Sequence, residues 1–249
     1  MCSSFVRQPV LLVTGASRGI GRAIAEHAGR RGYAVCVNYL RAQDQAEAVV
    51  EAIRSNGGTA VAVQADIGDP QSVDRLFAET AERLGPLTAL VNNAGEIPSR
   101  QDFSTMDDDD IDRLVSVNFT GAMRCMRRAI AQFRETGVGA IVNVSSEAAR
   151  FGGNRLAVYA ATKAALSMLT VSTARELAPL GIRVNAVSPG TILTDALAAE
   201  GEEVLEGLKR TLPMGRLGTT VEAAATVLWL LSDEASYVSG AVVPISGGR

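Results

Sequence analysis

The sequence predicts an α/β fold, a single doubly wound domain in which seven parallel strands form one sheet with helices on both faces. Two observations predict it. Helix-like stretches alternate with short apolar runs rich in Val, Ile, Leu and Ala, the composition of strands that are buried on both faces. No linker, low-complexity tract or shift of composition divides the 249 residues, so we expect one domain over residues 1–249.

The seven strands follow in chain order. Residues 10–13 form the first and residues 241–245 the last. Between them, helix-like stretches end near a glycine, which supplies the left-handed cap that stops a helix. These glycines are Gly32, Gly57, Gly85, Gly137 and Gly181. The strands after them are expected at residues 33–37, 59–63, 87–91, 140–144 and 182–187. Helices of three or more turns between parallel strands imply right-handed crossovers.

Charge and composition exclude several classes of protein. The chain has 24 Lys and Arg against 27 Asp and Glu, a net charge of −3, so it lacks the general basic field of a nucleic-acid-binding protein. Its first residues lack the apolar run of a signal peptide, and no stretch reaches transmembrane length. We therefore expect a cytoplasmic protein with no membrane contact, in which residues 1–8 are a flexible N-terminus.

No metal site is expected. Three cysteines, far apart, and one histidine support neither a zinc site nor a disulfide framework. Four aspartates at residues 107–110 could form an acidic metal-binding cluster. They precede an apolar periodic segment, however, and carboxylates are favoured at the positive end of a helix. We therefore expect this run to begin a helix.

A glycine-rich segment joins the first strand to the first helix, where a doubly wound sheet binds nucleotides. Gly15 suits a tight turn, while Gly19 and Gly21 let the backbone and the helix approach a pyrophosphate. The helix N-terminus attracts that negative charge. A glycine-rich loop without a ligand is the alternative, and its position in the first strand-to-helix turn argues against it.

Tyr159 and Lys163 stand four residues apart on a predicted helix, thirteen and seventeen residues after Ser146. Side chains at this spacing share one helix face, so the ammonium can act on the proton of the phenol. Taken alone, such a pair is ordinarily a surface feature. Behind a nucleotide loop it indicates proton transfer.

Several segments together resemble the short-chain dehydrogenase/reductases. They are Thr14 to Gly21, Asn92 to Gly95, Asn118, Ser146, the Tyr159 and Lys163 pair, and Ser188 to Gly190. The resemblance covers nearly the whole chain and implies a Rossmann-type domain. It also implies reversible hydride transfer between a nicotinamide and a carbonyl or secondary alcohol. A homotetramer, or else a dimer, is implied as well, with subunits meeting through residues 107–135 and 158–179.

The resemblance assigns four catalytic residues. Tyr159 would be the general acid for carbonyl reduction, and Lys163 would favour the phenolate by its charge. Ser146 would donate to the substrate oxygen, with Ser145 as second choice because its interval to Tyr159 fits less well. Asn118 would help to hold a water near the lysine. A local backbone contact is the alternative for Asn118, since Asn commonly makes one in a helix.

The resemblance also assigns the cofactor site. Its residues would be Gly15, Ser17, Arg18, Gly19, Ile20, Gly21, Asn38, Asp66, Ile67, Asn93, Ala94, Gly95, Tyr159, Lys163, Pro189, Gly190, Ile192 and Thr194. Where NAD-binding sheets offer an acid to the ribose, at the end of the second strand, this chain has Asn38. Arg18, inside the glycine loop, could donate to a 2′-phosphate. Both facts favour NADP(H) over NAD(H).

The substrate is less well defined by the sequence. Residues 191–217 have no clear periodicity and are expected to be a mobile lid over the substrate. Arg100, Arg150 and Arg155 flank the expected entrance, which would suit an anionic compound if they are more than solvated surface residues. The apolar Leu193, Leu197 and Met214 could form its wall.

Three alternatives remain for the activity. The chain resembles β-ketoacyl-carrier-protein reductases, but it has Leu180 where that group tends to carry an arginine, so carrier binding is doubtful. A sugar or polyol dehydrogenase, or a general carbonyl reductase, fits equally well. From another class, a non-catalytic NADP-sensing regulator is disfavoured because both Tyr159 and Lys163 are present.

Overall fold

The computed structural model describes residues 8–249, so the expected flexibility of the N-terminus lies almost entirely outside the described residues. Seven parallel strands form one sheet in the order β3-β2-β1-β4-β5-β6-β9, which confirms the predicted fold class. These strands are β1 Val10–Val13, β2 Ala34–Tyr39, β3 Thr59–Gln64, β4 Ala89–Asn92, β5 Gly139–Val144, β6 Ile182–Pro189 and β9 Val242–Ile245.

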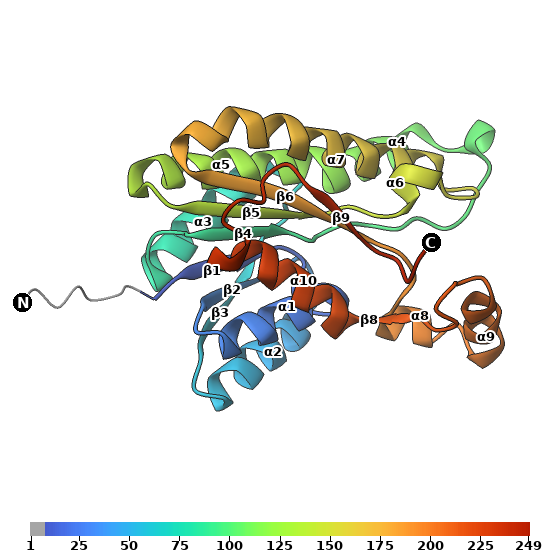
Figure 1. Ribbon diagram of the computed structural model, residues 1–249, viewed down its shortest axis with the longest axis horizontal. Coiled ribbons are helices and arrows are strands. Elements are labelled where there is room, and N and C mark those ends of the chain that lie inside the picture. The colour runs from blue at the N-terminus through green and yellow to red at the C-terminus, as the bar shows by residue number, and fades with distance from the viewer. Residues whose placement is uncertain (1–7) are drawn as a thin grey trace, which may run out of the picture.

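Helices cover both faces of the sheet (Figure 1). The longer ones are α1 Gly19–Arg30, α2 Gln43–Ser55, α3 Pro70–Leu84, α4 Asp108–Val115, α5 Ala122–Thr136, α7 Ala157–Leu177 and α10 Thr220–Leu231. The others are α6 Ala148–Phe151, α8 Asp195–Ala198 and α9 Glu202–Arg210. Helices α1, α2 and α10 pack on one face, and α3, α5 and α7 pack on the other.

Strand β1 shows why the apolar runs are continuous. Leu11 and Val13 face the core shared with α1, α2 and α10, whereas Val10 and Leu12 face the core on the other side. Successive side chains of a strand point to opposite faces, so a strand covered on both sides needs an apolar residue at every position. Two of the predicted glycine caps are found: Gly137 and Gly181, at φ 72° and 71°, end their helices in the left-handed conformation. Gly85 ends α3 at φ 96° and ψ −176°, outside that conformation.

The order of the strands reverses at β1, which pairs with β2 on one side and with β4 on the other. Such a reversal opens a crevice at the carboxyl ends of the strands, because the connections on its two sides run in opposite directions. The glycine-rich segment follows β1, and residues 93–95 follow β4. Both border this crevice, so the fold itself locates the candidate site.

Residues 192–219 contain more regular structure than the sequence suggested. Two short strands, β7 Ile192–Leu193 and β8 Gly218–Thr219, pair with each other, and α8 and α9 lie between them. In Figure 1 this segment projects beyond the carboxyl end of the sheet.

The aspartates at residues 107–110 begin a helix, as predicted: Asp107 caps α4 by accepting from the Asp109 amide.

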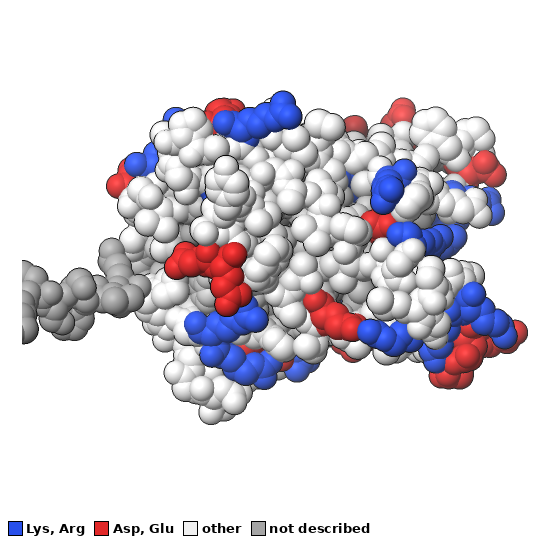
Figure 2. Space-filling model, viewed as in Figure 1, with Lys and Arg blue, Asp and Glu red and all other residues white. Residues whose placement is uncertain are grey.

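The surface carries charge of both signs. On the face in Figure 2, acidic and basic side chains form mixed groups around a largely uncharged centre. Within residues 8–249, no cluster of three His, Cys, Asp or Glu side chains is arranged to hold a metal ion. No helix in the same range combines the length and the apolar character that crossing a bilayer requires.

Candidate active site

Close packing requires glycine at two positions of the loop after β1, Gly15 and Gly21. A Cβ atom at Gly15 would lie 2.8 Å from Ala94 Cα, and one at Gly21 would lie 2.4 Å from Asn93 Nδ2. Gly21 is therefore required by contacts inside the protein rather than by the approach of a ligand. Gly19 differs, since its φ of 58° favours glycine while a Cβ would meet only Thr194, at 3.5 Å. The open side of the loop is thus at Gly19.

The predicted residues after β4 hold this loop in place. The hydroxyl of Thr14 accepts hydrogen bonds from the amides of Asn93 and Ala94, both at 3.0 Å. In return, the side chain of Asn93 donates to the carbonyls of Thr14 and Gly15, also at 3.0 Å. The Asn93 side chain therefore supports the glycine-rich loop from within the protein. Thr14 was outside our predicted set of site residues, although it opens the glycine motif.

Helix α1 begins at Gly19 with its first amides free for an anion. Arg18 is the N-cap residue, and no side chain caps the helix. An uncapped N-terminus directs unsatisfied N–H groups and a partial positive charge at a ligand. Arg18 is exposed beside it, and Ser17 and Ile20 are half-buried in the same turn. This cradle fits the diphosphate of a dinucleotide.

The structure corrects the expected role of Asn38. We expected its side chain to lie beside the adenine ribose, but it is 2% exposed. Its Oδ1 accepts from the Gly15 amide at 3.2 Å, and its Nδ2 donates to the carbonyls of Tyr39, Val63 and Ala65. All of its polar groups are used in bracing the loop. The next exposed side chains are Leu40 and Arg41, and neither is acidic.

Asp66 and Ile67, after β3, differ in what they can offer. Asp66 is exposed and accepts from the Gly68 amide at 2.7 Å through one carboxylate oxygen. The side chain of Ile67 is 5% exposed and belongs to the core under α3 and α5. Asp66 can therefore present its side chain to an adenine, whereas Ile67 can present only its backbone.

Tyr159 lies on α7 beside Ser146 and is 8% exposed. Burial raises the pKa of its phenol, and the Ser146 hydroxyl acts in the opposite direction because it can donate to the phenolate. The other serine lies elsewhere: Ser145 Oγ donates to the Lys163 carbonyl at 2.9 Å and contacts Ser167 Oγ at 2.7 Å. Ser145 therefore anchors α7, and only Ser146 adjoins the phenol.

Lys163 is buried one turn further along α7. Its Nζ donates to the Val144 carbonyl at 2.8 Å, and burial lowers the pKa of the amine to about 8. Nζ lies 5.9 Å from the centre of the Tyr159 ring. Burial, rather than the charge of Lys163, dominates the phenol pKa in this structure. Lys163 is thus held by the end of β5.

Gly95 brings Lys163 and Asn118 together. A Cβ at Gly95 would lie 3.1 Å from Asn118 Oδ1 and 3.2 Å from Lys163 Nζ. Asn118 is in a π-helical turn, Ser116–Gly121, between α4 and α5. Its Oδ1 accepts from the Glu96 amide at 2.7 Å, and its Nδ2 donates to the Glu96 carbonyl at 2.9 Å. Its side chain thus binds a segment 22 residues away, not its own helix as the alternative supposed.

The segment after β6 closes the crevice from the other side. The amide of Gly190 donates to the Ile245 carbonyl at 3.0 Å, and a Cβ at Gly190 would lie 3.1 Å from Ser246 Cα. Ile192 is buried in β7, and Thr194 caps α8 within contact of Gly19. The predicted residues of this segment therefore reach from the end of β6 to the glycine loop.

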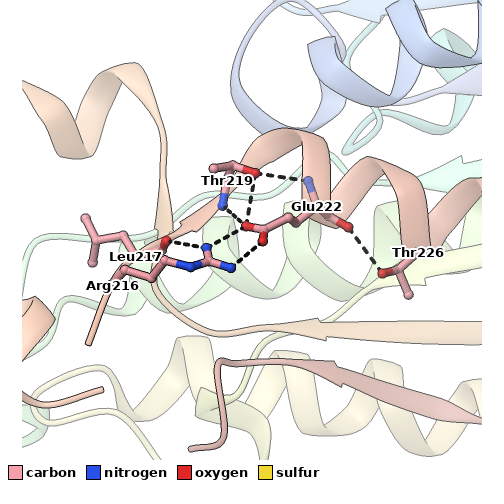
Figure 3. A network of polar contacts seen from close by, with 5 residues as sticks. All are labelled: Arg216, Leu217, Thr219, Glu222 and Thr226. Carbon is pink, nitrogen blue, oxygen red and sulfur yellow. Dashed lines mark hydrogen bonds and ion pairs between the residues drawn. The ribbon is translucent and has the colours of Figure 1, made fainter. Parts of the chain in front are cut away.

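The predicted lid is an organised unit. Leu205, Leu212 and Leu217 form a small core of their own, against which Leu197 and Leu208 pack. Figure 3 shows how the chain leaves it: Arg216 pairs with Glu222 at 2.6 and 3.0 Å, and Thr219 and Glu222 cap α10 reciprocally. The lack of periodicity over residues 191–217 reflects two short helices joined by turns.

Two of the three arginines at the expected entrance have partners at the surface, and the third, Arg100, is exposed. Arg155 lies 3.4 Å from Asp102 and has a φ of 59°, which is unusual for a residue with a side chain. Arg150 stacks on Phe151 at 4.9 Å. A small pocket beside Tyr159 is lined by parts of residues 98–106 and 155–158. These contacts satisfy Arg155 and Arg150 without an anionic substrate.

The chain is similar to several known proteins over nearly its whole length. A family model described as "Enoyl-(Acyl carrier protein) reductase" matches residues 15–249. The chain is 41% identical over 237 residues to the 3-oxoacyl-[acyl-carrier-protein] reductase FabG of Staphylococcus aureus, which covers 95% of this chain and 96% of that protein. It is 39% identical over 242 residues to 3beta-hydroxysteroid dehydrogenase 1 of Eggerthella lenta, covering 96% and 92%.

A solved structure is also similar. It is a short-chain dehydrogenase/reductase of Serratia marcescens, in a mutant form that carries leucine in place of two phenylalanines. The two folds superpose with a TM-score of 0.91 at 35% sequence identity, over 98% of each chain. The likeness therefore includes the segment between β7 and β8 as well as the sheet.

Proposed function

The chain belongs to the short-chain dehydrogenase/reductase family, a family of nicotinamide-dependent oxidoreductases, and from this we propose that it is an NADP(H)-dependent carbonyl reductase. One observation carries the proposal: Tyr159, with Ser146 beside it, and Lys163 lie on one face of α7, where Lys163 meets the carboxyl end of β5. The regulator interpretation is not adopted, because the relatives are enzymes.

The residues fit the cofactor that the family implies. The uncapped start of α1 and the open side of Gly19 would hold the diphosphate. Lys163 would reach the nicotinamide ribose past Gly95, where a side chain would obstruct it. The segment from Pro189 to Thr194 would cover the nicotinamide. When bound, the nicotinamide supplies or accepts a hydride at the carbon of the reacting carbonyl.

The protein's own groups would manage the charge on the substrate oxygen. Ser146 donates a hydrogen bond to it, which stabilises the negative charge that develops as the carbon is reduced. Tyr159 then transfers its proton to that oxygen, and in the reverse direction the phenolate removes the proton. The positive charge of Lys163 would stabilise the phenolate. Because burial lowers the pKa of the Lys163 amine to about 8, this amine gains and loses its proton close to neutral pH.

The preference for NADP(H) is supported by Arg18 and by the end of β2. Arg18 is exposed at the start of α1, where it can donate to a 2′-phosphate. No carboxylate follows β2, since the next residues are Leu40, Arg41 and Ala42. Asn38 contributes only by shaping the loop. Titration of the purified protein with NADPH and NADH, followed by nicotinamide fluorescence, tests this preference.

For the substrate, we propose a 3-oxoacyl thioester. Similarity to a 3-oxoacyl-[acyl-carrier-protein] reductase supports this class. Leu180, in the turn before Gly181, is 44% exposed where such reductases tend to carry an arginine, so we propose that the thioester need not be presented by a carrier protein. A ketone on an apolar ring is the second candidate, because Ile97 and Phe151, near site residues in the chain, are 69% and 56% exposed.

A substrate panel separates these candidates. Acetoacetyl-N-acetylcysteamine, the same acyl group on a carrier protein, a 3-ketosteroid and a ketose would each be assayed by loss of NADPH absorbance. The proposal expects the largest kcat/KM for the small thioester and no more than a modest gain from the carrier. A ketosteroid reduced far more efficiently than either thioester would favour the second candidate.

We also propose that copies of this chain associate through the α4 and α7 face. An apolar groove there is lined by Phe103, Val115, Phe119, Ala157, Val158, Ala161, Thr162 and Ala165. A second copy would cover it, as one of the interfaces of the homotetramer that the family resemblance implies. Light scattering tests this: Ala161→Arg should lower the molar mass, whereas the matched surface variant Ala48→Arg on α2 should not.

A further inference from the structure

Glu147 is a buried carboxylate directly after Ser146. It is 7% exposed, and its Oε1 accepts a hydrogen bond from Ser188 Oγ at 2.9 Å. Its other oxygen, Oε2, is buried without a hydrogen-bond partner among the described residues. Glutamate is rarely buried unless it is paired, because burial removes the water that solvates its charge. Within residues 8–249, the hydrogen bond to Ser188 is therefore the one that holds this carboxylate.

The same two turns are joined a second time through the backbone. The Glu147 amide donates to the Pro189 carbonyl at 3.0 Å, next to the Ser188 contact. One residue of the first turn thus binds two consecutive residues at the end of β6. Ser188 is itself 5% exposed and pairs with Pro244 of β9. The Glu147 carboxylate therefore binds a strand end that the neighbouring strand holds in place.

The two turns carry different parts of the site. The first contains Ser146, whose Oγ accepts from the Ala148 amide at 3.1 Å and adjoins Tyr159. The second leads through Gly190 into β7 and the segment proposed to cover the nicotinamide. Because the two contacts hold one turn against the other, they set the distance between the Ser146 hydroxyl and the segment proposed to cover the nicotinamide.

From this geometry we infer that Glu147 is a positioning residue: through Ser188 it holds the Ser188–Gly190 turn at the spacing from Ser146 that the nicotinamide requires. This inference rests on the proposed function. Glu147 acts through Ser188 and needs no contact with substrate or cofactor. If Glu147 only stabilised the fold, its substitution would lower the stability of the protein and weaken the binding of every ligand to the same degree.

Four variants separate the two roles, of which Glu147→Ala is the most direct. Ser188→Ala removes one oxygen and little volume, so it keeps the test valid even if Glu147→Ala folds poorly. Glu147→Gln retains an amide oxygen that can accept from Ser188. Ser239→Ala is the matched control, because its hydroxyl accepts from Val184 N, at 3.3 Å, near the opposite end of β6.

The experiment compares dissociation constants of NADPH and of adenosine 2′,5′-bisphosphate, which lacks the nicotinamide. Ser188→Ala and Glu147→Ala should weaken NADPH by about tenfold, the worth of a hydrogen bond to a charged group, and leave the bisphosphate unchanged. Glu147→Gln and Ser239→Ala should resemble wild type. Equal weakening of both ligands, or unchanged NADPH binding in Ser188→Ala, overturns the inference. Wild-type protein that binds neither NADPH nor NADH overturns the proposed function, and this inference with it.

Discussion

Lys163 Nζ donates a hydrogen bond to the Val144 carbonyl, so the ammonium expected to act on the Tyr159 phenol is held by the last residue of β5. Its distance of 5.9 Å from the centre of the phenol ring leaves the two groups near each other without a direct bond. Position on one helix face brings them together, and the strand decides how the amine is oriented.

Tyr159→Phe should lower kcat by about 10²- to 10⁴-fold, the usual contribution of a general acid, because it removes the proton that reaches the substrate oxygen. NADPH affinity should hardly change, since little volume is lost. Steady-state kinetics and cofactor titration measure both. Tyr237→Phe is the control, because Tyr237 is fully exposed. Wild-type turnover in Tyr159→Phe, where hydride transfer limits the rate, would contradict the mechanism.

The pKa of Lys163 can be measured directly, because the chain has one other lysine, Lys209. In protein labelled with isotopic lysine, Lys209→Arg should leave a single side-chain signal that titrates near pH 8 without added cofactor. The amine would then have a lower pKa in the folded protein than in the unfolded chain, where it is near 10.4. Burial of the charged amine therefore destabilises the folded state fully below about pH 8, and this cost fades as the pH rises from 8 toward 10.4. Titration of that signal above pH 10 would show that Lys163 is not desolvated.

Arg18→Ala should weaken NADPH by roughly ten- to a hundredfold and leave NADH almost unchanged, because the arginine would meet only the 2′-phosphate. Fluorescence titration with both cofactors is the measurement. Arg22→Ala, one turn along α1 and paired with Glu26, is the matched control. Equal losses for the two cofactors would place Arg18 away from the phosphate and remove the main support for NADP(H).

Asn38→Asp should weaken both cofactors rather than shift preference to NADH. An aspartate cannot donate to the carbonyls of Val63 and Ala65, and its charge would be buried under the glycine loop. Thermal denaturation and titration with both cofactors test this. Asn56→Asp, at the exposed end of α2, is the control. A variant of normal stability that prefers NADH would show that Asn38 can reach the ribose after all.

Glu222→Ala should lower the free energy of unfolding by about 1 kcal/mol, because the capping box of α10 is lost. Hydrogen bonds from Arg216 and Thr219 lower the pKa of Glu222 to about 2. The contribution should therefore be complete above the unfolded pKa near 4.3 and fade as pH falls toward 2, although solvent weakens the ion pair. Denaturant unfolding at pH 6 and pH 3 measures it, with Glu51→Ala as control. An unchanged difference between wild type and variant at the two pH values would contradict this assignment.

Most of the sheet was predictable because buried parallel strands leave a strong local signal. The strand residues 10–13 are apolar at every position, and the glycines after the helices mark each return to the sheet. Strands β7 and β8 were not predictable, since each has two residues and exists only by pairing across the lid. Helix α9 was missed for a related reason: its leucines face a small core made by the lid itself.

The candidate site shows the same division. The sequence by itself determined the fold class, the order of the motifs and the helix face shared by Tyr159 and Lys163, because these depend on spacing along the chain. Only the tertiary structure decided that Asn38 faces inward, that Ser145 anchors α7 through the Lys163 carbonyl, and that Glu147 binds the end of β6. Those outcomes depend on hydrogen bonds between segments 18 to 41 residues apart, which no local pattern encodes.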